Sequence, residues 1–92
     1  MPITILLVDD HILFRKGLRL LIDEEPDMSA VGEAGDGKEA LEKVRELAPA
    51  VVIMDISMPD FNGIDATRQI VSEVPSVKVV ALSMHAGKRY VE

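Results

Sequence analysis

A short apolar run that ends in a carboxylate constrains the fold of this chain more than any other feature. The run Ala50–Met54 (AVVIM) is rich in β-branched residues, shows no polar alternation and is followed by Asp55. Strands of this composition are buried on both faces, which is typical of parallel sheets that helices cover on both sides. Open α/β sheets carry their chemistry outside the carboxyl ends of the strands, so Asp55 is the first candidate functional residue.

Three further apolar runs indicate strands, and amphipathic segments lie between them. We predict strands at 3–8, 28–34, 50–54 and 77–82, and helices at 11–25, 38–48 and 64–74. Pro26, Pro49 and Pro75 each follow a predicted helix, as expected for a residue that cannot continue one. Residues 86–92 are predicted to be the opening turn or two of a fourth helix. The chain is therefore predicted to be one domain, residues 1–92.

The order of these elements predicts the fold class. Strands that alternate with helices imply right-handed crossovers and a parallel sheet covered on both faces. With the two most apolar strands, 3–8 and 50–54, as central neighbours, the spatial order of the strands is 2-1-3-4. This order is the beginning of the flavodoxin-like doubly wound α/β pattern. Gly32 and Glu33 interrupt the segment 28–34, which therefore suits an edge of the sheet.

Composition excludes several classes of protein. The 92 residues include no Cys, which excludes disulfides and thiolate metal sites. The longest N-terminal apolar run, 3–8, is too short for a signal peptide or a membrane span, so we expect a soluble cytoplasmic protein. The formal net charge of −6 argues against a nucleic-acid surface in this segment, because phosphate binding needs a basic face.

Three of the four predicted strands end in side chains suited to phosphoryl chemistry: Asp9 and Asp10, Asp55, and Ser83. Neighbouring strands lie about 4.8 Å apart, so Asp10 and Asp55 are expected to reach the same space, with Ser83 beside them. Carboxylates gathered this closely repel one another and favour a hard divalent cation such as Mg²⁺. With the cation in place, Asp55 is a plausible nucleophile that forms an acyl phosphate.

Each of these residues also has a simpler structural explanation when it is taken alone. Asp9 and Asp10 suit the start of a helix as caps, and Ser83 suits a turn. Their joint occurrence at the ends of separate strands favours a shared site. His11 and His85 are not expected to bind a metal, because no third partner stands at ligand spacing.

The residues at these strand ends resemble the receiver domain of bacterial two-component response regulators. VDDHILFRKGLRLLI, MPDFNGIDAT and ALSMHA are similar to receivers that precede a LuxR-type helix-turn-helix output domain. The resemblance implies that Asp55 accepts a phosphoryl group from a sensor histidine kinase and that the full-length parent controls transcription. It also implies Mg²⁺ held by Asp9, Asp10, Asp55 and the backbone carbonyl of Ser57, and Ser83 as the switch hydroxyl.

The chain departs from that family at its end. Receivers continue into a fifth strand that ends in a Lys, which contacts the phosphoryl group. No such Lys can be assigned here, because Lys88 and Arg89 belong to the predicted last helix. We therefore expect a receiver truncated before its fifth strand and last helix. The predicted strand 77–82 is then an exposed apolar edge, which favours a dimer through edge pairing or exchange of the terminal segment.

Two other functions remain open from the sequence. A phosphohydrolase also uses an Asp nucleophile after a strand, but it generally carries a second Asp two residues later, where this chain has Ser57. The missing Lys favours a truncated, phosphorylation-independent interaction domain that self-associates. The leading interpretation is a phosphoacceptor module, which at most catalyses its own phosphorylation and dephosphorylation and is not an enzyme in the ordinary sense.

Overall fold

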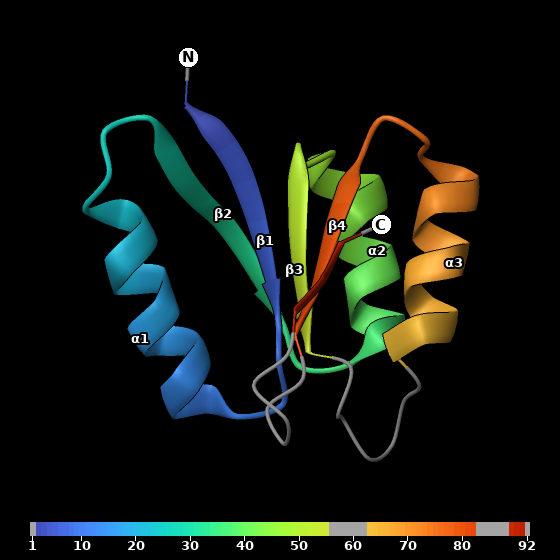
Figure 1. Ribbon diagram of the computed structural model, residues 1–92, viewed down its shortest axis with the longest axis horizontal. Helices are drawn as coiled ribbons and strands as arrows, with labels where there is room; N and C mark the ends of the chain where they lie inside the picture. The colour runs from blue at the N-terminus through green and yellow to red at the C-terminus, as the bar shows by residue number, and fades with distance from the viewer. Residues whose placement is uncertain (1, 56–62, 83–88, 92) are drawn as a thin grey trace.

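The computed structural model describes residues 2–55, 63–82 and 89–91, which form one twisted sheet flanked by helices (Figure 1). The strands are β1 (Ile3–Val8), β2 (Met28–Ala34), β3 (Val51–Asp55), β4 (Lys78–Leu82) and β5 (Arg89–Val91). The helices are α1 (Ile12–Asp23), α2 (Gly37–Leu47) and α3 (Gly63–Glu73). The sheet has the order β2-β1-β3-β4-β5, and its first four strands are parallel. The predicted order 2-1-3-4 and the flavodoxin-like α/β fold are confirmed.

The end of the chain differs from the prediction. Instead of opening a helix, Arg89–Val91 forms β5, which runs antiparallel to β4 and pairs with its residues 80–82. A helix of one or two turns is marginal in water because few of its hydrogen bonds repay the ordering of its backbone. The edge of β4 instead presents backbone N–H and C=O groups with which an extended segment can form hydrogen bonds. Arg89 therefore belongs to a strand and not to a helix, and Lys88 lies outside the described residues. The edge of β4, predicted to be exposed, is paired with β5 at residues 80–82.

The edge position predicted for 28–34 is also observed, since β2 is the outer strand beside β1. The pairing of the two strands shifts after Ile5, so that Leu6 stands opposite Gly32. A Cβ atom added at Gly32 would lie 2.7 Å from Leu47 Cδ1 and 3.3 Å from Leu6 Cδ1. Glycine at this position therefore lets the end of α2 pack directly on the sheet.

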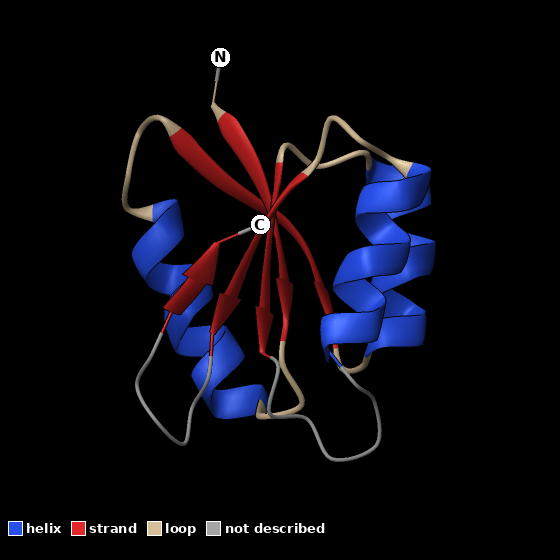
Figure 2. Ribbon diagram, turned by 45° about the vertical axis from the view of Figure 1, so that its right-hand side comes forward, coloured by secondary structure: helices blue, strands red, loops and turns tan. Residues whose placement is uncertain are grey.

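The two faces of the sheet carry separate cores, because successive side chains of a strand point to opposite faces. α2 and α3 lie together on one face and α1 lies on the other (Figure 2). The larger core, on the face of α2 and α3, includes Leu6, Val8, Val52, Met54, Val79, Val44 and Ile70. The smaller core, next to α1, consists of Ile5, Leu7, Ile22 and Ala30.

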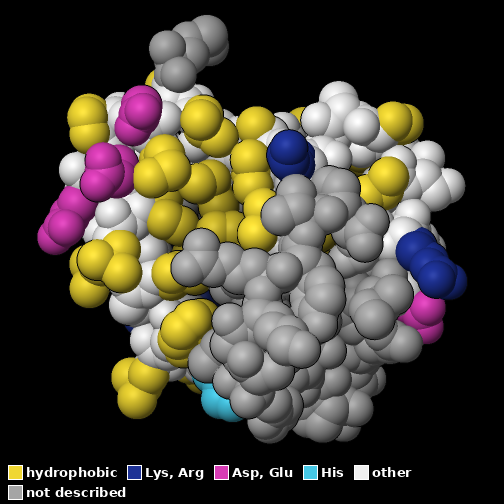
Figure 3. Space-filling view, in the orientation of Figure 1, with side chains coloured by type: hydrophobic (Ala, Val, Ile, Leu, Met, Phe, Trp, Pro, Cys, Tyr) yellow, Lys and Arg dark blue, Asp and Glu magenta, His cyan; other side chains and the backbone are white. Residues whose placement is uncertain are grey.

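The face of the sheet next to α1 is covered only in part. Ile22 is the buried residue of this helix, whereas Leu13 is 88% and Leu20 is 70% exposed. Val51 and Ile53 are half-buried although β3 is a central strand. Hydrophobic side chains gather over the strands beside α1 (Figure 3). Within the described residues, no helix is long and apolar enough to cross a membrane.

Candidate functional site

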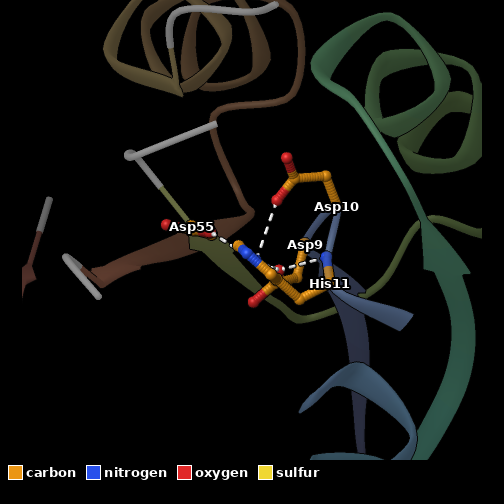
Figure 4. A group of neighbouring side chains, drawn as sticks. All are labelled: Asp9, Asp10, His11 and Asp55. Atoms are coloured by element: carbon orange, nitrogen blue, oxygen red, sulfur yellow. Dashed lines mark hydrogen bonds and ion pairs between the residues drawn. The ribbon is translucent and has the colours of Figure 1, made fainter. Parts of the chain in front are cut away.

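The carboxylates of Asp9, Asp10 and Asp55 lie together at the carboxyl edge of the sheet (Figure 4). Asp9 and Asp10 follow the last residue of β1, and Asp55 is the last residue of β3. These strands are parallel neighbours in which Val8 is paired with Met54, so both end at the same edge. One oxygen of each carboxylate and a ring nitrogen of His11 all lie within 4.8 Å of one another. The structure thus brings Asp10 and Asp55 together, as the strand order predicts.

Two of the three carboxylates are buried. Asp9 is 5% and Asp55 is 2% exposed, whereas the Asp10 side chain is one-third open to solvent, with 33% of its surface exposed. Removing a carboxylate from water costs free energy unless hydrogen-bond donors or a cation compensate. A buried pair with a third, more open carboxylate beside it therefore favours a cation that enters from the side of Asp10.

The helix-capping explanation for the acidic pair fits the structure poorly. The N-cap residue of α1 is His11, and its own side chain makes no capping hydrogen bond. Asp9 Oδ1 instead accepts a hydrogen bond of 2.7 Å from the backbone N–H of His11, in the bend before the helix. The acidic pair therefore precedes the helix and is directed toward Asp55.

The imidazole of His11 lies among the three carboxylates. Its Nδ1 atom is 3.0 Å from Asp9 Oδ1, 3.0 Å from Asp10 Oδ1 and 3.9 Å from Asp55 Oδ2. The hydrogen bond to Asp9, followed by the negative charge of Asp10, raises the pKa of His11 above its ordinary value. From the sequence, His11 is not expected to bind a metal because no third partner stands at ligand spacing, but the fold brings three carboxylates to its ring. These carboxylates lie at the ends of two different strands, β1 and β3, and the local sequence signal for His11 is its position directly after the acidic pair.

Two predicted site residues, Ser57 and Ser83, lie outside the described residues. The same is true of His85 and Lys88, for which no role in the site is predicted. The sheet nevertheless shows where β4 ends. β3 and β4 are parallel, and Asp55 is paired with Leu82, the last residue of β4. The carboxyl ends of β1, β3 and β4 therefore share the edge at which the carboxylates gather.

The donor set suits a hard divalent cation. Mg²⁺ takes oxygen ligands, commonly one or two carboxylates, and keeps its other positions for water and phosphate. Structural zinc sites instead use four tetrahedral ligands that are mostly sulfur and nitrogen, and this cluster offers one nitrogen and no sulfur. Among the described residues, Asp9, Asp10 and Asp55 offer the carboxylate oxygens that such an ion takes.

Comparison with known proteins shows that the chain matches one protein family and is similar to solved structures. Residues 5–92 match the response regulator receiver domain. The chain is 43% identical over 89 residues to the transcriptional regulatory protein DegU of Brevibacillus brevis, an alignment that covers 97% of this chain and 38% of DegU. The chain thus spans well under half of that relative.

Two solved structures show the same fold. A LuxR-family two-component response regulator from Aurantimonas sp. SI85-9A1 superimposes with a TM-score of 0.86 at 39% identity, covering 92% of this chain and 61% of that one. The response regulator domain of Thermotoga maritima CheB has a TM-score of 0.81 at 43% identity, covering 90% of this chain and 61% of that one.

Proposed function

This chain belongs to the receiver domain family of two-component response regulators, in its LuxR-type branch, and from that premise we propose that Asp55 is its phosphoacceptor. One observation carries the proposal: the buried carboxylate that ends central strand β3 lies within reach of the two carboxylates that follow β1. Phosphoryl transfer needs a nucleophile in a fixed position and neutralised charge. The strand fixes the position of Asp55, and a cation held by the cluster would neutralise the charge.

The proposed reaction uses Asp55 as the attacking group. A carboxylate oxygen attacks the phosphorus atom of a phosphohistidine on a sensor histidine kinase. The phosphorus–nitrogen bond breaks as the new oxygen–phosphorus bond forms, and the imidazole leaves with the electron pair of the broken bond. The product is an acyl phosphate on Asp55. β3 is paired with β1 on one side and β4 on the other, and this pairing holds the nucleophile in place.

We propose that Asp10 and Asp55 bind Mg²⁺ directly, that Asp9 does so through water, and that the backbone carbonyl of Ser57 adds a ligand. When bound, the ion neutralises the charge of the transferring phosphoryl group and of the carboxylates. Ser83 is proposed as the switch hydroxyl, which donates a hydrogen bond to a phosphoryl oxygen. These assignments rest on the acidic cluster and on the family's motifs in this sequence.

The wider partners follow from the same premise. We propose a sensor histidine kinase as the phosphodonor and transcription control as the output of a longer parent. The relative DegU is a transcriptional regulatory protein, of which this chain matches 38%. With a net charge of −6, the present segment is proposed to regulate DNA binding elsewhere in the parent instead of contacting DNA.

Labelling with a small phosphodonor tests the function. The protein is incubated with Mg²⁺ and acetyl phosphate, and its intact mass is measured. We expect a gain of one phosphoryl group that Asp55→Asn abolishes. Asp65→Asn, at an exposed aspartate in the first turn of α3, is the matched control and should label normally.

The other outcomes identify the alternatives. Repeated release of phosphate by the wild-type protein would indicate a phosphohydrolase. No labelling of the wild-type protein would favour the phosphorylation-independent interaction domain, and either result would overturn Asp55 as a simple phosphoacceptor.

A second proposal is self-association, for which the C-terminal strand gives a specific reason. β5 contains three residues and is held to β4 by three residue pairs. The same pairing can form between two copies if each copy donates its β5 to the other, at little cost in free energy. The apolar surface next to α1 offers further area for contact between copies.

A further inference from the structure

A cluster of opposite charges joins α1 to the end of β2. The carboxylate of Glu33 accepts hydrogen bonds from Arg15 Nε at 2.8 Å, Lys16 Nζ at 3.0 Å and Arg19 Nη1 at 2.6 Å. The side chains of Glu33 and Arg15 are only 10% and 14% exposed. Burial raises the pKa of Glu33, but the hydrogen bonds from Arg15, Arg19 and Lys16 outweigh it and lower this pKa to about 2. Glu33 is therefore ionised at neutral pH and anchors these cations.

Arg15 uses the rest of its guanidinium on the backbone of the acidic site. Its Nη1 atom donates to the carbonyl oxygen of Asp9 at 2.5 Å and to that of Ala34 at 3.4 Å. The backbone N–H of Asp9 donates to the same carbonyl of Ala34 at 3.0 Å. Both backbone groups of Asp9 are thus tied to the end of β2, one directly and the other through Arg15.

We propose that Arg15 is a positioning residue for the cation site: Glu33 orients its guanidinium, which fixes the backbone of Asp9 and so places the Asp9 carboxylate. The inference rests on the proposed Mg²⁺ site. Arginine suits this role because its planar fork has five donors, so Nε binds Glu33 while Nη1 binds the carbonyls. A lysine carries the same charge on a single nitrogen and cannot span these partners with fixed geometry.

Charge and positioning predict opposite effects of removing Arg15. A positive side chain near the site repels Mg²⁺, so on charge alone its removal would tighten Mg²⁺ binding. If Arg15 places Asp9, its removal weakens Mg²⁺ binding instead. Asp9 is proposed to hold the ion through water, and loss of such outer-shell support typically costs about 10- to 100-fold in metal affinity. The sign of the change therefore separates the two roles.

Mg²⁺ titrations of the ¹⁵N-labelled protein, followed by amide chemical shifts, give the Mg²⁺ dissociation constant and so show whether removal of Arg15 weakens or tightens binding. We expect Arg15→Gln and Arg15→Lys each to raise the dissociation constant about tenfold or more. The Lys variant keeps the charge and tests geometry alone. Glu33→Gln should weaken binding less, because Arg15 remains. Glu73→Gln removes an exposed ion pair with Arg45 (2.7 Å) between α2 and α3, and as the control it should leave the constant unchanged.

The outcomes distinguish this inference from the function on which it rests. The dissociation constant is measured on folded protein, as the amide spectrum shows, so a loss of stability alone does not move it. Unchanged or tighter Mg²⁺ binding in both Arg15 variants would overturn the positioning role while the Mg²⁺ site stands. A wild-type protein without a saturable Mg²⁺ response would overturn the proposed site and this inference together.

Discussion

The Nδ1 atom of His11 lies 3.0 Å from Oδ1 of Asp10, and the same nitrogen is 3.9 Å from Oδ2 of Asp55. The imidazole thus stands where its positive form would offset the charge of carboxylates from two different strands. In protein free of divalent metal, we expect the pKa of His11 to lie above its ordinary value, as the hydrogen bond to Asp9 and the charge of Asp10 require. An NMR titration of the imidazole nitrogens measures it.

Substitution of one carboxylate checks the cause of that shift. Asp10→Asn should lower the pKa of His11 toward its ordinary value, because it removes a negative charge 3.0 Å away. Asp65→Asn, in the first turn of α3, should leave the titration unchanged. A His11 pKa that does not respond to Asp10→Asn would show that the two groups do not interact in solution.

The acidic cluster is expected to destabilise the metal-free protein. At a separation of about 4 Å two carboxylates repel by about 1 to 4 kcal/mol, depending on how far water screens them. In alkaline buffer with a chelator, where the His11 imidazole is neutral, Asp10→Asn should therefore raise the free energy of unfolding by about 1 kcal/mol. Urea unfolding measures this change.

Added Mg²⁺ should reverse that order of stability. The wild-type protein binds the ion to its folded state and gains stability by mass action, whereas Asp10→Asn has lost a ligand and gains less. If Mg²⁺ stabilises both proteins equally, Asp10 is not a ligand.

The Glu33 cluster predicts a dependence of stability on pH. Hydrogen bonds from Arg15, Arg19 and Lys16 lower the pKa of Glu33 from its ordinary value of 4.5 to about 2 in the folded protein. A depressed carboxyl pKa contributes stability that is present above the unfolded pKa and is lost as pH falls through the folded pKa. We expect wild-type protein to lose about 3 kcal/mol more than Glu33→Gln between pH 5 and pH 2.

Urea unfolding across this pH range makes the comparison. Glu73→Gln serves as the control, since Glu73 pairs with Arg45 and both side chains are more than one-third exposed. It should follow the wild-type curve, because exposed pairs contribute little. Parallel curves for wild type and Glu33→Gln would show that the cluster is not formed in solution.

Self-association is tested by sedimentation velocity at tens of micromolar, where we expect a dimer. Tyr90→Pro removes a backbone donor from β5 opposite Ala81 and weakens the pairing of β5 with β4. If copies exchange β5, this variant should be monomeric. If they pair through the edge of β4, the variant should associate more strongly, since that edge is then uncovered. A monomeric wild-type protein with cooperative thermal unfolding would count against both arrangements.

Much of the fold was predictable because its signals are local. The bounds predicted for β1 and β2 coincide with those observed, and the other predicted bounds up to residue 82 lie within a residue or two. Apolar runs, helical spacing and the prolines after the helices are read from neighbouring residues. The strand order followed from the composition of two runs, and it placed Asp10 near Asp55. The exception is β5, whose partner strand, not its own sequence, decided its conformation.

The sequence by itself determined which carboxylates stand at the strand ends, and hence the kind of chemistry available. Tertiary structure alone decided what surrounds them. His11 lies near Asp55 because β1 and β3 are neighbours, and the guanidinium of Arg15 binds both Glu33 of β2 and the carbonyl of Asp9. Strand composition and carboxylate position follow from local patterns. The contacts of His11 with Asp55 and of Arg15 with Glu33 join residues from different elements, which only the pairing of the strands and the packing of α1 on the sheet bring together.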